Sequence, residues 1–323
     1  MPEHQAPELS IVIPVYNEEE NVEPLLDEIK AALEPTGKDY EIVVVDDGSQ
    51  DRTFSILARL HAREHRLRVV RLKRNFGQTA AMAAGLAHSD GEVVVTMDGD
   101  GQNDPADIPL LLEELDKGND LVSGWRHERQ DSFLSRRLPS MIANRLISST
   151  TRVKIHDYGC TLKAMRREVA KNLKLYGEMH RFIPAIAYER GARVAEIKVN
   201  HRPRLRGTSK YGITRTLRVV LDLMTVKFLT SYSTRPSHVF GPIGVLSAGA
   251  GFAIGVYLSL EKFLRGVSIG NRPLLLLSIL LIFIGFQFIT MGLLGEMLAR
   301  TYHESQDRSI FVVGETLGER KQS

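Results

Sequence analysis

Two acidic side chains, Asp98 and Asp100, stand two residues apart directly after an apolar or β-branched run, Val93–Met97. Such a run is typical of a strand buried on both faces in a parallel sheet, and its C-terminal end then presents the acids in a loop. Two carboxylates this close repel each other unless a cation lies between them, and hard oxygen ligands suit Mg²⁺ or Mn²⁺. An isolated Asp-x-Asp is more often an acidic surface turn, so the context of the pair has to decide. An EF-hand calcium loop is disfavoured, because Asn103 and Pro109 stand where that pattern needs Gly and Glu.

A second acidic pair, Asp46–Asp47, ends another strand-like segment, Glu41–Val45. In a doubly wound sheet the carboxyl ends of the parallel strands lie on one edge, where ligands bind. We therefore expect the two acidic loops to converge. No Gly-x-Gly-x-x-Gly follows the first predicted strand, and no Gly-x-x-x-x-Gly-Lys-Ser/Thr occurs in the chain. Both absences argue against a classical dinucleotide or P-loop site.

Segments typical of strands and helices alternate along the first 200 residues and would position these acids. Asn17 is the predicted N-cap of the first helix, and Pro105 suits the first position of the fourth. Four alternations of strand and helix predict an α/β fold with a doubly wound, mostly parallel sheet. The predicted strands are Leu9–Tyr16, Glu41–Val45, Leu67–Leu72, Glu92–Met97, Asp120–Arg126 and Ala192–Val199. The first predicted helix begins after Asn17 and keeps its period to Gly37, and the others are Asp51–Arg63, Gln78–Ala87 and Pro105–Lys117.

Two long uncharged segments lie in the C-terminal part of the chain. The mean hydropathy of −0.13 resembles that of a soluble protein, but Val239–Leu260 and Pro273–Gly295 are each free of charged residues. Each is long enough to cross about 30 Å of hydrocarbon as a helix, and neither is N-terminal, as a signal peptide would be. The single cysteine, Cys160, excludes an internal disulfide and fits a reducing compartment. We expect a cytosolic domain on a two-helix anchor, and the net charge of +3 gives no sign of nucleic acid binding.

Basic residues gather just before the first uncharged segment. Residues 202–235 hold eight Lys or Arg and one acid, which favours a juxtamembrane helix facing anionic headgroups over an ordinary solvated face. Residues 133–147 mix basic and apolar side chains and suit a membrane surface or a packed amphipathic helix. The predicted organisation is therefore an α/β domain (1–200), a basic juxtamembrane segment (201–238), a transmembrane anchor (239–298) and a polar C-terminal tail (299–323).

Several ordered motifs resemble the signatures of family 2 glycosyltransferases, which have the GT-A fold. The first three are Ile13–Glu18, Val45–Ser49 and Met97–Gln102. The match is closer to the polyprenyl-phosphate glycosyltransferases, the group of bactoprenol glucosyltransferase and dolichol-phosphate mannose synthase. The supporting motifs are Asn75–Gln78, Asp157–Cys160, Arg206–Tyr211 and Gly285–Glu296.

The resemblance implies a reaction and its partners. It implies inverting transfer of a sugar from a nucleoside diphosphate sugar, for example UDP-glucose, to undecaprenyl or dolichyl phosphate, with GDP-mannose or a UDP-linked amino-arabinose as alternative donors. A non-catalytic membrane adaptor is a second possibility, although both acids of the Asp-x-Asp are intact. A processive polysaccharide synthase is disfavoured, because the chain has no Gln-x-x-Arg-Trp. The implied setting is the inner membrane, with the catalytic domain and both termini cytosolic and the chain as a homo-oligomer.

The resemblance also assigns roles to individual residues. Asp98, Asp100 and Gln102 would hold Mg²⁺ or Mn²⁺, and Asp98 would also contact the nucleotide. Asp157 would orient or deprotonate the acceptor, and with Asp100 and Arg126 it makes up the expected catalytic set. The remaining expected binding residues are Pro14, Tyr16, Glu18 and Asp46 or Asp47 for the base and ribose, and Arg126, Arg204, Arg206 and Lys210 for the phosphates.

Overall fold

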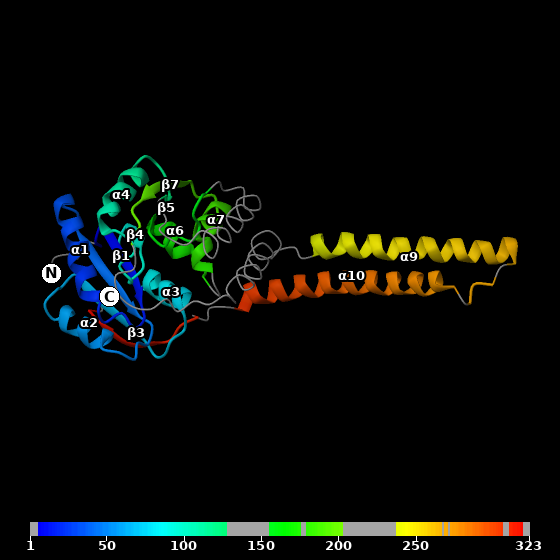
Figure 1. The fold of residues 1–323 in the computed structure, drawn as a ribbon, viewed down its shortest axis with the longest axis horizontal. Coiled ribbons are helices and arrows are strands. Elements are labelled where there is room, and N and C mark those ends of the chain that lie inside the picture. The colour runs from blue at the N-terminus through cyan, green and yellow to red at the C-terminus, as the bar shows by residue number, and fades with distance from the viewer. Residues whose placement is uncertain are drawn as a thin grey trace. The chain divides into compact units, whose positions relative to one another are not determined.

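The computed structural model describes residues 6–127, 155–175, 179–202, 237–266, 268–270, 272–305 and 310–318. These residues form two units. The first is an α/β unit that combines the residues up to 202 with the C-terminal segment 310–318, and the second is a helical unit between them. Figure 1 shows the elements of both units, labelled in chain order.

One eight-stranded sheet runs through the described part of the α/β unit, in the order β7-β5-β6-β4-β1-β2-β3-β8. Only β6 and β8 run antiparallel to their neighbours, so the prediction of a mostly parallel α/β sheet is confirmed. The strands are β1 (Leu9–Val15), β2 (Tyr40–Asp46), β3 (Leu67–Leu72), β4 (Val93–Thr96), β5 (Leu121–Arg126), β6 (Lys163–Arg166), β7 (Val194–Val199) and β8 (Val313–Leu317).

Helices cover both faces of the central strands, which explains why β1 and β2 have no polar alternation. Every residue of these two strands is buried. Ile11 and Ile13 share one core with α1 and α4, whereas Val12 faces α3, where Gly85 leaves no space for a side chain. The described helices of this unit are α1 (Val22–Leu33), α2 (Thr53–His61), α3 (Gln78–His88), α4 (Ile108–Asp116), α6 (Arg167–Asn172) and α7 (Ile183–Glu189), with 3₁₀ turns at Glu34–Thr36, Pro105–Asp107 and Met179–Phe182.

The start of the first helix differs from the prediction. The helix α1 begins at Val22 with Asn21 as its N-cap residue, and Asn17 has a left-handed backbone with φ of 53°. The Asn17 side chain accepts a hydrogen bond from the Gln50 amide (2.8 Å) instead of capping a helix. Asn17 therefore shapes the loop after β1, and its capping role was wrongly predicted.

The predicted polar tail also differs from the structure. The helix α10 continues to Ser305, and residues Val313–Leu317 form strand β8, which pairs antiparallel with β3. The pairing places Leu317 opposite Val69 and satisfies backbone groups that β3 would otherwise leave open at the edge of the sheet. Part of the segment 299–323 thus belongs to the α/β unit.

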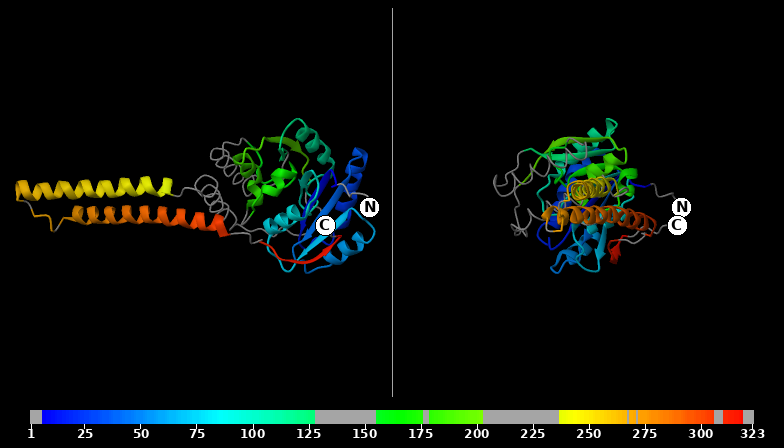
Figure 2. Two further views of the ribbon diagram at one scale, coloured as in Figure 1. Left: turned by 180° about the vertical axis from the view of Figure 1, so that it is seen from behind. Right: turned by 90° about the vertical axis from the view of Figure 1, so that its right-hand side faces the viewer.

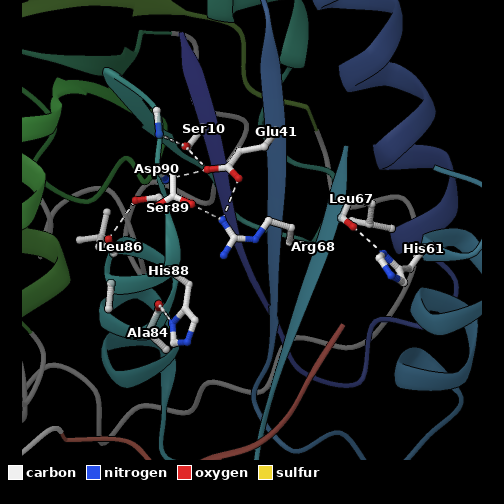
Figure 3. A network of polar contacts seen from close by, with 12 residues as sticks. Ser10, Glu41, His61, Leu67, Arg68, Ala84, Leu86, His88, Ser89 and Asp90 are labelled. Atoms are coloured by element: carbon white, nitrogen blue, oxygen red, sulfur yellow. Dashed lines mark hydrogen bonds and ion pairs between the residues drawn. The ribbon is translucent and has the colours of Figure 1, made fainter. Parts of the chain in front are cut away.

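A buried polar network holds the end of the sheet where the central strands begin (Figure 3). The carboxylate of Glu41 accepts hydrogen bonds from the Ser10 hydroxyl (2.6 Å), the Asp90 amide (2.7 Å) and the Arg68 guanidinium (2.9 Å). Arg68 also contacts the Asp90 carboxylate at 2.8 Å. A buried charge needs such partners, and these tie β1, β2, β3 and the turn before β4 together.

The helical unit is a hairpin of α9 (Ser237–Arg265) and α10 (Pro273–Ser305), which lie side by side in every view (Figures 1 and 2). The Ser278 hydroxyl donates to the Gly251 carbonyl (2.7 Å), and Gly285 lies against α9 where a side chain would not fit. Phe240–Arg265 and Pro273–Gly295 have mean hydropathies of 1.8 and 2.5, and only 17% and 11% of their most apolar windows are buried. Both are therefore candidate membrane spans and not core helices of a soluble domain.

Candidate active site

The predicted site residues collect at the carboxyl edge of the sheet. Because β1, β2, β4 and β5 are parallel, the loops that follow them leave from the same edge. Val15, the last residue of β1, pairs with Asp46, the last residue of β2. This topology agrees with the predicted convergence of the two acidic loops.

Asp98 and Asp100 lie in the loop that follows β4. The Asp98 Oδ1 atom accepts a hydrogen bond from the Gln78 amide (2.7 Å), and the Asp100 Oδ1 atom accepts one from the backbone of Gln102 (3.1 Å). Gly99 packs on the end of β1 so closely that an added Cβ would meet Val15 at 2.5 Å. Burial, and next the negative charge of Asp100, raise the pKa of Asp98 to about 6.

The carboxylate oxygens of Asp98 and Asp100 are hard ligands of the kind that a divalent cation such as Mg²⁺ or Mn²⁺ prefers. A cation between Asp98 and Asp100 would remove the repulsion that raises the Asp98 pKa. The described residues contain no cluster of three or more His, Cys, Asp or Glu side chains arranged for a metal. Mg²⁺ held by two carboxylates typically takes its remaining ligands from water and substrate phosphate, so two acids suffice for such a site.

Asp46 and Asp47 are neighbours with different surroundings. Asp47 accepts from the backbone amides of Phe76 (2.8 Å) and Gly77 (2.9 Å), so both of its oxygens hold the loop before α3. Asp46 accepts from the Ser49 amide (3.0 Å) through Oδ1, whereas its buried Oδ2 has no hydrogen-bond partner among the described residues. Of these two acids, only Asp46 therefore has a carboxylate oxygen without a hydrogen bond among the described residues, and that oxygen is buried beside Arg71.

The loop after β1 is fastened to the loop after β2. The backbone amide of Asn17 donates to the Ser49 hydroxyl, and that of Glu18 donates to the Thr53 hydroxyl, both at 2.9 Å. These bonds place Tyr16, partly exposed, directly beyond the end of β1 and beside the Asp46 loop. Pro14, one position inside β1, pairs with Val45 in β2.

Arg126 and Asp157 form a buried ion pair beside the acidic loops. Nε of Arg126 donates to Oδ2 of Asp157 at 2.7 Å, and Nη2 donates to Oδ1 at 3.0 Å. Burial lowers the pKa of Arg126, but the charge of Asp157 and its hydrogen bonds outweigh burial and raise it. The structure thus brings together two members of the expected catalytic set, Arg126 and Asp157.

Lys163 is a buried residue near the site that the sequence analysis missed. It is 1% exposed, lies in β6 and donates its ammonium to the Cys160 carbonyl. Burial lowers its pKa, whereas the negative charges of Asp157 and Asp98 act in the opposite direction. The sequence signal was a lysine inside the otherwise uncharged stretch Cys160–Met165, but the placement of β6 between β4 and β5 was not predicted. Gln78 belongs to the motif Asn75–Gln78, but the sequence did not predict its hydrogen bond to Asp98.

Three predicted phosphate-binding residues, Arg204, Arg206 and Lys210, lie outside the described residues. The same holds for the amphipathic segment 133–147 and most of the basic segment 202–235. The last described residue before them, Arg202, donates its backbone amide to the Gln102 carbonyl (2.9 Å). The basic segment therefore begins beside the loop of Asp98, Asp100 and Gln102.

Comparisons with known proteins agree on one family. The model of glycosyl transferase family 2 matches residues 10–174. The dodecaprenyl-phosphate galacturonate synthase of Rhizobium johnstonii is 44% identical, over 99% of this chain and 96% of that protein. The undecaprenyl-phosphate 4-deoxy-4-formamido-L-arabinose transferase of Edwardsiella ictaluri is 41% identical, over 94% and 93%.

Among solved structures, glucosyl-3-phosphoglycerate synthase from Mycobacterium tuberculosis, in complex with Mn²⁺ and UDP-glucose, has a similar fold. The TM-score is 0.55 at 20% identity, over 71% of this chain and 82% of that one. At this identity the likeness concerns the fold alone.

Proposed function

We propose, on the premise that the chain belongs to glycosyl transferase family 2, that it transfers a sugar from a nucleoside diphosphate sugar to a polyprenyl phosphate. The observation that carries the proposal is the 44% identity to a polyprenyl-phosphate sugar synthase over 99% of the chain. That match includes both acidic loops, the Arg126–Asp157 pair and both candidate membrane spans. This chain has both acids of the Asp-x-Asp, which a non-catalytic adaptor would not need.

The names of the relatives favour particular donors. Galacturonate and 4-deoxy-4-formamido-L-arabinose are the sugars in those names, and we put their UDP-linked forms ahead of UDP-glucose and GDP-mannose. The experiment is to incubate the purified chain with Mn²⁺, undecaprenyl phosphate and each of these four donors, and to identify the glycolipid by mass spectrometry. A product from GDP-mannose or UDP-glucose alone would overturn this order of donors.

The acidic loops would bind the diphosphate end of the donor. Asp98 and Asp100, with Gln102 beside them, would hold Mg²⁺ or Mn²⁺, which when bound neutralises charge on the departing diphosphate. Gln78 keeps the Asp98 carboxylate in place through the 2.7 Å hydrogen bond to Oδ1. A fixed carboxylate costs no rearrangement as charge develops, which is how preorganised groups speed transfer.

Asp46 is the acid that we assign to the nucleoside. Its Oδ2 is buried 3.6 Å from Nε of Arg71 but makes no hydrogen bond among the described residues, and we assign it to accept a ribose hydroxyl or a base N–H. Asp47 is already engaged with the Phe76 and Gly77 amides, so it shapes the loop instead. Pro14, Tyr16 and Glu18 would line the same pocket. Asp46→Asn should weaken nucleotide binding, measured by calorimetry, and equal binding would contradict the assignment.

The acceptor needs little activation. A phosphate monoester has a second pKa of about 6, so its oxygen is already an anion near neutral pH. That oxygen forms a bond to the anomeric carbon as the bond to the diphosphate breaks, which inverts the carbon and releases the nucleoside diphosphate. Arg126 and Asp157 would align the acceptor, and Arg204, Arg206 and Lys210 would supply the cations that hold two anionic reactants together.

The helical hairpin would anchor the enzyme in the inner membrane. Strand β8 pairs with β3, so the chain segments before α9 and after α10 fold into one unit. Both segments must then lie on the same side of the bilayer, as two crossings require. Because nucleotide sugars are cytosolic, we place that side, with both termini, in the cytosol.

A second copy of the chain is the proposed partner of α10. Gln287 lies near the middle of Pro273–Gly295, its side chain is exposed, and it has no hydrogen-bond partner among the described residues. An amide in hydrocarbon gains about 1–2 kcal/mol by bonding across helices, and two identical amides satisfy each other.

Gln287→Leu should reduce chemical cross-linking between copies in membranes. Thr290→Val is the control, because the Thr290 hydroxyl already donates to the Phe286 carbonyl (2.9 Å). Unchanged cross-linking in Gln287→Leu would contradict the contact.

A further inference from the structure

A single carboxylate, that of Glu196 in β7, holds the backbone just before the Arg126–Asp157 ion pair. Its Oε1 atom accepts from the backbone amides of His156 and Asp157, both at 3.0 Å. Its Oε2 atom lies 3.0 Å from the His156 amide and 2.8 Å from Nδ1 of the His156 ring. The Glu196 side chain is only 9% exposed, whereas the His156 side chain is 65% exposed.

The His156 ring is held from a second side by Trp125. The two rings stack with centroids 4.2 Å apart and an interplanar angle of 15°. Trp125 lies in β5, and Lys198 of the neighbouring strand β7 places its ammonium 5.5 Å from the centre of the indole. The turn at His156 is therefore fixed to both strands of the β5–β7 pair.

These contacts bear directly on the ion pair. Trp125 precedes Arg126 in β5, and His156 precedes Asp157 in the turn. The same two strands therefore fix the guanidinium through one residue and the carboxylate through the other. Hydrogen bonds from backbone amides to a charged carboxylate are about twice as strong as neutral ones, which makes Glu196 the firmest of these attachments.

We infer that Glu196 is a positioning residue, which fixes the backbone at His156–Asp157 so that the Asp157 carboxylate meets Arg126 in the geometry that aligns the acceptor. The inference rests on the proposed function and adds a residue to it. Glu196 contacts neither acidic loop in the described residues, so its effect passes through Asp157.

The chain offers a matched control on the same two strands. At the other end of the β5–β7 pair, Asp120 accepts hydrogen bonds from the Arg193 backbone (2.8 Å) and from its guanidinium (3.2 Å). Asp120→Asn therefore weakens the pairing of the same strands without touching the His156 turn. If Glu196 acted only in strand pairing, Glu196→Gln and Asp120→Asn would lower kcat to the same extent.

The experiment uses the full chain in detergent and compares wild type, Glu196→Gln, Asp157→Asn, the double variant and Asp120→Asn. Glu196→Gln keeps the size of the side chain but leaves one oxygen to accept, so we expect kcat to fall about tenfold to a hundredfold with KM for the nucleotide sugar within about twofold. The double variant should be no slower than Asp157→Asn, because both changes act through one group. Asp120→Asn should keep the wild-type kcat. The inference would be overturned if the fall in kcat of the double variant were the product of the two single falls, or if Asp120→Asn lowered kcat as much as Glu196→Gln.

Hydrogen exchange gives a readout that does not depend on turnover. In a peptide spanning residues 155–162, the amide hydrogens of His156 and Asp157 should exchange faster in Glu196→Gln than in wild type. In Asp120→Asn they should exchange at the wild-type rate. Unchanged protection in Glu196→Gln would overturn the inference whether or not the enzyme is active. A wild type that transfers no sugar would count against the proposed function alone. If Glu196→Gln does not fold, Glu196→Asp, which is too short to reach both amides, is expected to give the same kinetic and exchange results.

Discussion

Both oxygens of the Asp157 carboxylate are bound by the Arg126 guanidinium, at 2.7 and 3.0 Å. Asp157 also accepts the Gly159 amide at 3.1 Å and is 3% exposed. A carboxylate in a bidentate pair with arginine is stabilised as an anion and is a poor acceptor of a further proton. The geometry therefore favours a positioning role over that of a general base.

The pH profile of Asp157→Asn separates these two roles. Asparagine loses one charge-assisted contact to Arg126, worth about 1.5–3 kcal/mol, so we expect transfer to fall about tenfold to a hundredfold. Because the lipid phosphate ionises without help, the loss should be constant from about pH 6.5 to 9. Steady-state rates of wild type and variant across this range are the measurement. Recovery of the variant as the pH rises would instead identify Asp157 as a base.

His180 predicts a stability change in the acidic range. It is buried, its Nδ1 lies 2.7 Å from the Thr79 hydroxyl, and burial together with the charges of Arg181 and Lys163 lowers its pKa to about 3. Below about pH 6.5 the unfolded chain takes up a proton that the folded chain refuses. Stability should therefore fall as the pH drops, by up to about 1.4 kcal/mol per pH unit for this one group.

The test compares melting temperatures of wild type and His180→Gln between pH 7.5 and 5. The melting temperature of the variant should fall less on acidification, because glutamine keeps a polar partner for Thr79 but does not titrate. His65→Gln, at an exposed position, is the control and should follow wild type. Parallel curves for wild type and His180→Gln would show that His180 is not held neutral in the folded state.

The contrast between Asp98 and Lys163 shows what the sequence predicted and what it did not. Asp98 follows an uninterrupted apolar strand, a local pattern that predicts both the strand and the loop after it. Lys163 lies in β6, a four-residue strand that reaches the centre of the sheet only through pairing with β4 and β5. No local periodicity encodes such a long-range insertion. Strand β8, which pairs with β3 from the far end of the chain, was missed for the same reason.

The adjacent acids Asp46 and Asp47 illustrate the same limit within the site. Their residue types and positions were predicted, but their separate tasks depend on the Phe76 and Gly77 amides some thirty residues away. Glu196 was likewise an ordinary strand residue in the sequence. Its role follows from the meeting of β7 with the turn at His156.

The membrane topology is open to a labelling test. With α9 and α10 as spans, a cysteine placed at Gly270, between them, should react with an impermeant maleimide added outside intact cells. A cysteine at Gln322 should react only after permeabilisation. The native Cys160 is buried and should stay silent, so it is the internal control. The reverse labelling pattern would contradict a cytosolic catalytic domain.

The most direct measurement of the central claim is a product analysis with the purified chain. Wild type, given Mn²⁺, undecaprenyl phosphate and the best donor, should form a lipid heavier by one sugar and release one nucleoside diphosphate for each. EDTA should stop the reaction and added Mn²⁺ or Mg²⁺ restore it. Asp98→Asn should lower the rate about a hundredfold to a thousandfold, by analogy with losing one preorganised electrostatic group. Asp116→Asn, at an exposed carboxylate paired with Arg166, should leave the rate unchanged. Full activity in EDTA or in Asp98→Asn, or release of nucleotide with no glycosylated lipid, would contradict the account.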